Sequence, residues 1–429
     1  MKRIETMNLK LELDRHPCFN ADAKGHCGRV HLPVAPKCNI KCNYCNRKYD
    51  CVNESRPGVT SATLSPRQAL EYMKKVLEKE PRITVAGIAG PGDPMADPSA
   101  TIETLRLLRE SYPDLLLCLA TNGFGLPDHL DDLAEIGVSH VTVTVNAVDP
   151  EIGARIYSWV RDGKVIYRGV KGAELLLERQ IESIQGLKER GIIVKVNTIV
   201  VPGINDHHVE EVARRMAELG VDLLNCMPMY PNEDTPFAAI PEPSPEQMIN
   251  LRRTGEKYLP QMRHCTRCRA DAVGLLDSDR TDEFRSCLSE CSRSIPAGKD
   301  RPYVAVASME GVLVNLHLGE AGSFQIWQKS DRGYEMVEER SAPAPGNGLK
   351  RWMELANVLE DCRAVLVAGI GDNPAAVLTE SGITPVEMNG FIVEGLHAVF
   401  DGGNLRSVKG RRQGCTKGQS CNGGGGGCM

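Results

Sequence analysis

Apolar runs alternate with amphipathic segments from residue 29 to about residue 261 of this chain. Near-continuous Val, Ile and Leu runs are typical of parallel strands that are covered on both faces, and apolar residues three or four apart are typical of helices packed on a sheet. The predicted strands are residues 29–36, 83–90, 115–121, 140–147, 192–201 and 222–228. The predicted helices are residues 66–78, 100–110, 128–136, 173–190, 207–219 and 245–257.

Six strand–helix units in this order predict an α/β fold, a partial (β/α)6 barrel rather than a closed eight-fold barrel. The predicted strands end in glycine and polar residues at positions 89–94, 121–123, 146, 201–206 and 227–231. The chemistry of barrel proteins gathers at the carboxyl ends of the strands. We therefore expect these residues to form the wall of a pocket.

A second, smaller α/β unit follows a change in composition. Residues 263–300 are charged, contain cysteines and lack the apolar pattern of strands. We expect them to connect the two α/β units. Strand patterns resume at residues 303–308, 311–318, 323–328 and 364–368, with helices expected at 349–360 and 375–379. A run of five glycines near the end predicts a flexible tail. The expected parts are residues 1–28, 29–262, 263–300, 301–410 and 411–429.

Composition and charge narrow the class of protein. The chain is 41% hydrophobic and 25% charged, which is ordinary for a globular protein, and its net charge of -5 gives no basic footprint for nucleic acid. The first residues lack the apolar core of a signal peptide, and no stretch approaches the ~20 apolar residues of a membrane span. We expect a cytoplasmic protein with neither nucleic acid nor membrane as a partner.

The most informative motif is the CxxxCxxC triplet of Cys38, Cys42 and Cys45. In a reducing compartment, 16 cysteines indicate metal or redox chemistry rather than disulfides. Three thiolates can hold three irons of a cubane cluster and leave the fourth iron open. The alternative is a structural zinc site, which prefers four ligands and paired CxxC motifs. The triplet favours the cluster, with the spacing of radical S-adenosylmethionine (SAM) enzymes.

Further potential ligands surround the triplet. Cys18, His26, Cys27, His31 and Cys51 lie close to it in sequence, Cys118 lies within the third predicted strand, and Cys265 and Cys268 form a CxxC motif downstream. Such a motif supplies two thiolates and needs further ligands from elsewhere, and Cys51 is well placed to provide one. Cys18, Cys118 and a histidine make another potential group. Buried cysteines are often only small apolar residues, the interpretation we adopt for Cys226, Cys287, Cys291 and Cys362.

Glu54 and Arg56 follow Cys51 in the run Glu54-Ser55-Arg56-Pro57. A carboxylate and a guanidinium two residues apart can relay protons or bind an anion. The more common interpretation of such a pair is a solvent-exposed local ion pair with no role in catalysis. The number of potential ligands in this loop weakens that common interpretation, and Glu54 and Arg56 are therefore kept as catalytic candidates.

Taken together, these motifs resemble the NifB family of radical SAM proteins, which build the iron–sulfur core of the nitrogenase cofactor. The resemblance rests on His16-Pro17-Cys18, the triplet, the run 54–57, the glycine turn 89–94, Thr121-Asn122-Gly123 and the run 265–274. The part after residue 301 resembles the small NifX-like (ribonuclease H-like) cofactor-carrier fold by its architecture and position.

The resemblance implies a reaction on clusters. Two [4Fe-4S] substrate clusters are fused with a carbide from the SAM methyl group and an added sulfur, which gives an [8Fe-9S-C] precursor. It implies that Cys51, Cys265 and Cys268 hold one substrate cluster, and that Cys18, Cys118 and a histidine hold the other. We favour His31 as that histidine, with His26 as the alternative.

The resemblance also implies where the cofactor binds and which proteins take part. Expected SAM-binding positions are Tyr44, Gly90, Gly92, Asn122, Thr144, Asn146 and Val196. Expected partners are iron–sulfur cluster donors, cofactor carriers or scaffolds of nitrogenase assembly, and an electron donor such as a ferredoxin.

Two other functions compete with this interpretation. A peptide-modifying radical SAM maturase would use its extra clusters as electron carriers, and those clusters generally lie in a cysteine-rich C-terminal domain. A non-catalytic iron–sulfur scaffold would need no SAM pocket, so Tyr44 and the turn at Gly90 and Gly92 argue against it.

Overall fold

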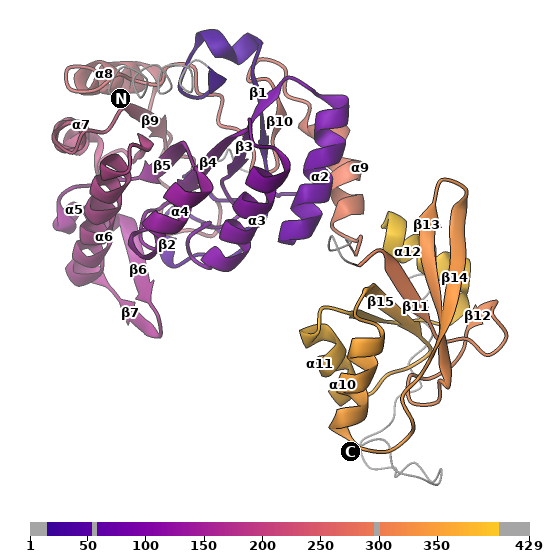
Figure 1. Cartoon of the computed structure of the whole chain (residues 1–429). Coiled ribbons are helices and arrows are strands. Elements are labelled where there is room, and N and C mark those ends of the chain that lie inside the picture. The colour runs from indigo at the N-terminus through magenta and orange to yellow at the C-terminus, as the bar shows by residue number, and fades with distance from the viewer. Residues whose placement is uncertain (1–14, 54–57, 296–300, 403–429) are drawn as a thin grey trace. The chain divides into compact units, whose positions relative to one another are not determined.

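The computed structural model describes residues 15–53, 58–295 and 301–402. The chain divides into two compact units, Met1–Leu288 and Ser289–Met429 (Figure 1). The division falls within the predicted connector 263–300. The five-part organisation of the chain stays a prediction, and its tail, residues 411–429, lies outside the described residues.

A seven-stranded sheet forms the centre of the first unit, with the strand order β10-β1-β3-β4-β5-β8-β9. Its parallel strands are β1 (Gly28–His31), β3 (Ile83–Ile88), β4 (Leu116–Thr121), β5 (His140–Thr144), β8 (Ile193–Val200) and β9 (Leu223–Pro228). The short strand β10 (Val273–Gly274) pairs antiparallel with β1 at the edge. The predicted partial barrel is confirmed, and each of its six parallel strands matches a predicted run.

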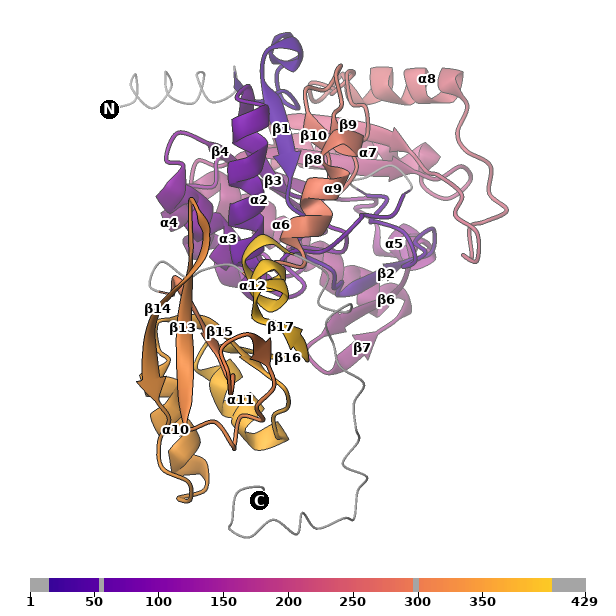
Figure 2. The same cartoon turned by 90° about the vertical axis from the view of Figure 1, so that its right-hand side faces the viewer.

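Helices between the strands cover the sheet, as Figures 1 and 2 show from two sides. They are α2 (Pro66–Lys79), α3 (Pro98–Ser111), α4 (Leu130–Ile136), α5 (Pro150–Ile156), α6 (Gly169–Glu189), α7 (Val209–Glu218), α8 (Pro245–Gly255) and α9 (Thr281–Cys291). The start of α2 illustrates how sequence sets these bounds. The Ser65 side chain accepts from the backbone of Gln68, whose side chain accepts from the backbone of Ser65, so the capping box fixes the first turn.

A three-stranded sheet outside the barrel holds the cysteine loop, and the sequence interpretation missed it. Strand β2 (Ile40–Cys42) pairs with β6 (Tyr157–Asp162), which pairs with β7 (Val165–Tyr167). The signal was present in the sequence, because a two-residue hairpin turn that begins with glycine is a preferred type, and Gly163-Lys164 forms this turn between the two strands. Pairing to β6 ties Cys42 to a second element of regular structure.

The first barrel strand is shorter than predicted, since β1 ends at His31 and not at residue 36. Beyond His31 the backbone NH of Leu32 still donates to the carbonyl of Gly87, but that of Val34 turns back to Leu32. The chain therefore leaves the sheet and enters the loop that carries the cysteine triplet.

The second unit contains a five-stranded sheet with the order β14-β13-β11-β15-β16. Its strands are β11 (Tyr303–Val306), β13 (Ser323–Ser330), β14 (Gly333–Ser341), β15 (Cys362–Val367) and β16 (Thr384–Glu387), and β12 (Leu313–Val314) pairs separately with β17 (Gly390–Phe391). Its helices are α10 (Leu349–Val358), α11 (Asp372–Glu380) and α12 (Ile392–Asp401). The expected small α/β unit is confirmed, but β14, β16, β17 and α12 were not predicted.

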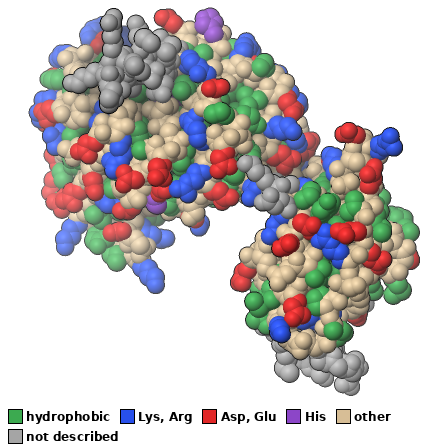
Figure 3. Space-filling view, viewed as in Figure 1, with side chains coloured by type: hydrophobic (Ala, Val, Ile, Leu, Met, Phe, Trp, Pro, Cys, Tyr) green, Lys and Arg blue, Asp and Glu red, His purple; other side chains and the backbone are tan. Residues whose placement is uncertain are grey.

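Charged side chains of both signs are interspersed over the visible face of the first unit (Figure 3). Within the described parts of the chain, no helix has the length and apolar character needed to cross a membrane.

Candidate functional site

The predicted cysteine triplet lines one hollow of about 320 Å³, its open mouth included. We call it the triplet hollow, and its wall includes Cys38, Cys42, Tyr44, Cys45, Cys51, Asn53, Asp93 and Asn122. Cys42 and Cys45 are buried, and Cys38 is partly exposed. The structure therefore brings all three cysteines of the motif to one place.

The glycine turn after β3 packs against the cysteine loop. The Gly92 NH donates to the Ala35 carbonyl at 2.6 Å, and the Asp93 NH donates to the Lys37 carbonyl at 2.7 Å. A Cβ atom on Gly92 would lie 2.1 Å from the Lys37 carbonyl oxygen. Glycine at this position is thus required by the close contact with the cysteine loop.

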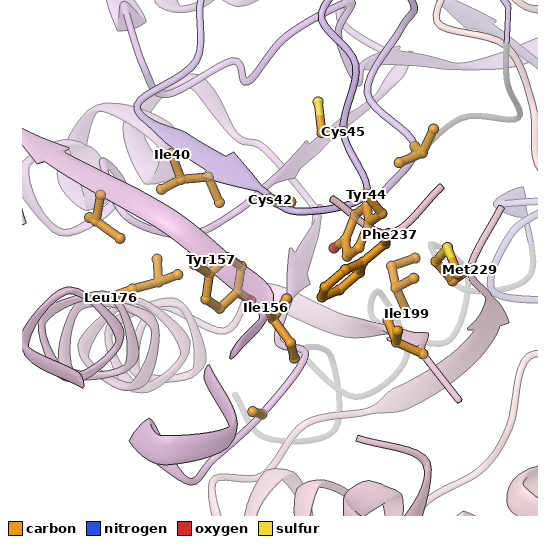
Figure 4. Close-up of a cluster of buried hydrophobic side chains, with 14 of the residues drawn as sticks. Ile40, Cys42, Tyr44, Cys45, Ile156, Tyr157, Leu176, Ile199, Met229 and Phe237 are labelled. Atoms are coloured by element: carbon orange, nitrogen blue, oxygen red, sulfur yellow. The ribbon is translucent and has the colours of Figure 1, made fainter. Parts of the chain in front are cut away.

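Tyr44 is fully buried at the base of this site and is held by two amides. Its hydroxyl donates to Asn53 Oδ1 and accepts from Asn146 Nδ2, both at 2.7 Å. Its ring lies beside that of Phe237, with 6.4 Å between centroids, and Figure 4 shows Cys45 lying apart from the two rings. Asn146 also accepts from the NH of Ile199 at 2.8 Å. The side-chain nitrogen and oxygen of Asn146 therefore both have protein partners. In this structure the Asn146 side chain positions Tyr44.

The other predicted SAM-binding residues do not all reach the triplet hollow. Asn122 lines it, and its side chain donates to Asn39 Oδ1 at 2.7 Å. Thr144 and Val196 lie buried in strands β5 and β8, and neither lines this hollow or the second one. Gly90 has a φ of 151° and faces Ala270, whose Cβ would be 3.3 Å from a Cβ at position 90. Their assignment to SAM stays a prediction.

The donor set of the triplet hollow fits an iron–sulfur cluster. Burial raises the pKa of Cys38 to about 12 and raises that of Cys42 still further, so both thiols keep their protons until a metal displaces them. Three converging thiolates match a cubane with one open iron. Within the described residues no group of three His, Cys, Asp or Glu side chains is arranged around a single metal position.

Most of the remaining predicted ligands line a second hollow, of about 640 Å³ with its open mouth included. They come from widely separated parts of the chain and are Cys18, His31, Cys118, Cys265 and Cys268. Burial raises the pKa of Cys18 to about 12, so this thiol also stays protonated without a metal. These five predicted ligands thus share one cavity in the barrel.

Cys51 was grouped with Cys265 and Cys268 in the sequence interpretation, and the structure places it on the wall of the triplet hollow. Cys265 packs against the core cluster that contains Tyr44. The buried guanidinium of Arg267 donates to the Val52 carbonyl at 3.1 Å. This hydrogen bond joins the segment of Cys51 to the CxxC motif of Cys265 and Cys268.

His31 is oriented as a metal ligand would be. Its Nδ1 lies 2.9 Å from the Arg269 carbonyl oxygen, which can only accept, so Nδ1 carries the proton and Nε2 keeps its lone pair. Burial, followed by the charge of Arg29, lowers the pKa of His31 to about 4. Gly87 leaves room for the ring, because a Cβ there would be 3.2 Å from His31 Cδ2.

The alternative histidine, His26, lies at the end of the 3-10 helix Asp22–Gly25 and lines neither hollow. The structure instead adds His16 to the wall of the second hollow. His16 Nδ1 accepts from the Cys18 NH at 3.1 Å, so its proton sits on Nε2, and in this tautomer His16 is a donor and not a ligand. Of the two histidines that line the second hollow, His31 is the one whose hydrogen bond leaves the Nε2 lone pair directed away from the backbone acceptor, and its role as a ligand stays a prediction.

Two cations in the second hollow were missed from the sequence, namely Arg29 and Lys195. Both are buried, on β1 and β8. A signal was available, because Lys195 interrupts the otherwise apolar run Ile192-Ile193-Val194-Lys195-Val196. A lysine inside a strand that is covered on both faces is rare and requires an explanation. The catalytic candidates Glu54 and Arg56 lie outside the described residues.

Comparisons with known proteins identify the families to which the two units belong. A model of the radical SAM superfamily matches residues 32–216, and a model of the dinitrogenase iron-molybdenum cofactor family matches residues 301–402. Superfamily membership implies a [4Fe-4S] cluster and SAM as cofactors of the first unit, and the second unit is the expected NifX-like domain.

Several curated relatives match nearly the whole chain. The FeMo cofactor biosynthesis protein NifB of Chlorobaculum tepidum is 51% identical over 424 residues, covering 98% of this chain and 100% of the relative. The protein of the same name from Klebsiella pneumoniae is 40% identical over 403 residues, covering 86% of each chain. That from Azotobacter vinelandii is 37% identical, covering 88% of this chain and 86% of its own. The chain belongs to the NifB family of FeMo cofactor biosynthesis proteins.

Proposed function

We propose that this protein is the radical SAM enzyme that fuses two [4Fe-4S] substrate clusters with a SAM-derived carbide and one extra sulfur into the [8Fe-9S-C] precursor of the nitrogenase cofactor. The observation that carries the proposal is the second hollow, where Cys18, His31, Cys118, Cys265 and Cys268 share one wall. An enzyme acting on an organic substrate would have no use for so many metal-binding groups beside its SAM site.

The triplet hollow would hold the resident cofactors. Cys38, Cys42 and Cys45 supply three thiolates, and the fourth position is left for SAM. When bound, the cluster and SAM supply the 5'-deoxyadenosyl radical that abstracts a hydrogen atom from a methyl group. The protein positions Tyr44 through Asn53 and Asn146, and the buried wall excludes water from a reactive radical.

The second hollow would hold the substrate clusters, each by three protein ligands. We assign Cys18, Cys118 and His31 to one cluster, and Cys51, Cys265 and Cys268 to the other. The ready lone pair of His31 supports the first set. The approach of Val52 to Arg267 supports the second, since it links the loop of Cys51 to the CxxC motif. Three ligands hold a cubane less completely than four, which suits a substrate that must leave.

The remaining roles follow from the same proposal. Glu54 and Arg56 would relay protons that leave the methyl-derived carbon. Cluster donors, a cofactor carrier or scaffold of nitrogenase assembly, and an electron donor such as a ferredoxin would act as partners. The NifX-like unit would hold the product or dock one of these proteins, all in the cytoplasm.

The test uses anaerobically reconstituted, reduced full-length protein and SAM labelled with carbon-13 in its methyl group. We expect an acid-stable cluster that carries the label and activates cofactor-deficient dinitrogenase. Cys118→Ala should abolish this product and remove iron. Cys226→Ala is the matched control, because Cys226 is a buried strand cysteine that lines neither hollow. An unlabelled product, or full product from Cys118→Ala, would overturn the proposal.

A further inference from the structure

One face of the hairpin β6–β7 is turned towards solvent. Arg161 and Ile166 stand directly opposite each other on this face, and the alternation of side chains along β6 puts Trp159 there as well. Arg161 and Ile166 are exposed, and Trp159 is partly exposed. Val160 belongs to the opposite face, which is the inner one, since this residue is fully buried in the core. Figure 1 shows the hairpin at the lower edge of the first unit.

Positive charge predominates on this hairpin. Residues 155–171 contain five Lys and Arg side chains and a single carboxylate, Asp162, although the whole chain has a net charge of -5. Alternation puts Asp162 on the face opposite to Arg161. The Arg161 guanidinium lies 5.4 Å from the centre of a tryptophan ring, and Arg168 donates to a backbone carbonyl at 3.3 Å, contacts that leave both charges unneutralised. We define the hairpin face as Trp159, Arg161, Lys164, Ile166 and Arg168.

The hairpin is joined to the strand that carries the cysteine triplet. Tyr157 of β6 pairs with Cys42 of β2. The Arg161 NH donates to the carbonyl of Asn39, the residue after Cys38, at 2.8 Å. A molecule bound to the hairpin face is therefore connected, through hydrogen-bonded backbone, to two of the three cysteines of the triplet.

This face fits a protein that delivers single electrons. A radical SAM cluster needs one electron for each cleavage, and SAM takes its open iron, so the electron has to enter through the protein around the cysteines. Electron carriers bind weakly over small interfaces, and opposite charge steers their encounter with a partner. Figure 3 shows Lys and Arg side chains at the lower end of the first unit, where this hairpin lies. Ile166, 44% exposed, adds an apolar contact among them.

We propose that the hairpin face docks a small acidic iron–sulfur electron carrier, which reduces the triplet cluster. The inference rests on the proposed function, which requires an electron donor, and it names the surface that this donor uses. In the step itself one electron passes from the reduced cluster of the carrier to the oxidised triplet cluster. The carrier leaves oxidised by one electron, and no bond forms or breaks.

The test measures SAM cleavage by reconstituted full-length protein with two reductants. One is a ferredoxin of net negative charge, kept reduced by NADPH and an excess of ferredoxin reductase. The other is dithionite, a small reductant that needs no docking surface. The triple variant Arg161→Glu, Lys164→Glu, Arg168→Glu should raise the KM for ferredoxin about tenfold or more at low salt, because it reverses the charge of the face. Its cleavage of SAM with dithionite should equal that of the parent, since none of the three residues lines the triplet hollow.

A matched control reverses three charges elsewhere, at the exposed residues Lys24, Lys74 and Arg253, none of which lines the triplet hollow. This control should leave the KM for ferredoxin unchanged. Added salt should raise that KM in the parent and have little effect in the triple variant, because salt screens exposed charges. Lys164→Glu alone, in the exposed turn, should raise the KM about twofold, and it decides the question if the triple variant folds poorly.

An unchanged KM for ferredoxin in the triple variant, with normal cleavage under dithionite, would overturn the inference. A face that serves a scaffold, a lipid surface or a second copy of this chain would give that result. An equal rise of KM in the control would overturn it too, since net charge and not the face would then be the cause. Both results leave the proposed function standing, because that function is judged by the labelled cluster product. A parent protein that cleaves no SAM under dithionite would overturn both.

Discussion

The contact between Gly92 and the cysteine loop leads to a sharp prediction for Gly92→Ala. The new Cβ would lie 2.1 Å from the Lys37 carbonyl oxygen and 2.8 Å from that of Ala35, whereas ordinary contacts begin near 3.4 Å. The loop must therefore retreat by more than 1 Å, about the difference between 2.1 and 3.4 Å. Neither neighbour is a flexible side chain that can turn aside, so the backbone itself has to move.

That retreat breaks two backbone hydrogen bonds, from Gly92 to Ala35 and from Asp93 to Lys37. At roughly 0.5–1.5 kcal/mol each, their loss lowers the free energy of unfolding by about 1–3 kcal/mol. The displaced segment leads directly into Cys38, so the triplet should lose its geometry. We expect the variant to bind less iron at the triplet and to cleave little SAM, while the second hollow keeps its clusters.

The assay combines urea unfolding of the iron-free protein with iron content and SAM cleavage of the reconstituted protein. Gly322→Ala is the control, since a Cβ there meets no atom within 4 Å and the backbone at Gly322 is not left-handed. The reasoning is refuted if Gly92→Ala unfolds within about 0.5 kcal/mol of the parent and cleaves SAM normally, the range expected of an unperturbed surface site.

Three further predictions follow from buried contacts. Tyr44→Phe leaves two buried amide groups without a partner, so urea unfolding should show a loss of about 2–4 kcal/mol, and a loss below 0.5 kcal/mol would contradict the network. His31→Ala should lower iron content and alter the paramagnetic spectrum of one substrate cluster, whereas His26→Ala should leave both unchanged; equal spectra for the two variants would reject His31 as a ligand. Hydrogen bonds from Arg82 lower the pKa of Glu80 from its ordinary 4.5 to about 2, so its carboxylate stabilises the fold above about pH 4.5 and loses this effect as the pH falls towards 2. Glu80→Gln should therefore cost about 1 kcal/mol at pH 7 in urea unfolding, and a gap that persists undiminished at pH 2 would count against it.

The barrel was predictable because each of its parallel strands is a nearly continuous apolar run in the sequence. The hairpin β6–β7 and strand β14 were missed for a shared reason, which is that most of their residues are partly or fully exposed and so form no long apolar run. Their pairing is decided by neighbours distant in sequence: β6 pairs with the cysteine-bearing β2. Propensity within a short window does not carry that information.

For the site, the motif predicted the three cysteines of the triplet, and the structure brings them together. Spacing alone did not place Cys51, which lies on the triplet wall even though the resemblance grouped it with the CxxC motif. Arg29 and Lys195 belong to no motif at all. Only the fold shows that both side chains line one cavity.

Asn53 has a consequence that extends beyond its bond to Tyr44. Its side chain accepts from Tyr44 in the triplet hollow, while its backbone carbonyl accepts from Asn197 Nδ2 at 3.2 Å, and Asn197 lines the second hollow with Asn225. Asn53 thus has a hydrogen bond to a residue that lines each hollow. A displacement of Asn53 would disturb both hydrogen bonds at once, so this residue ties the geometry of one hollow to that of the other.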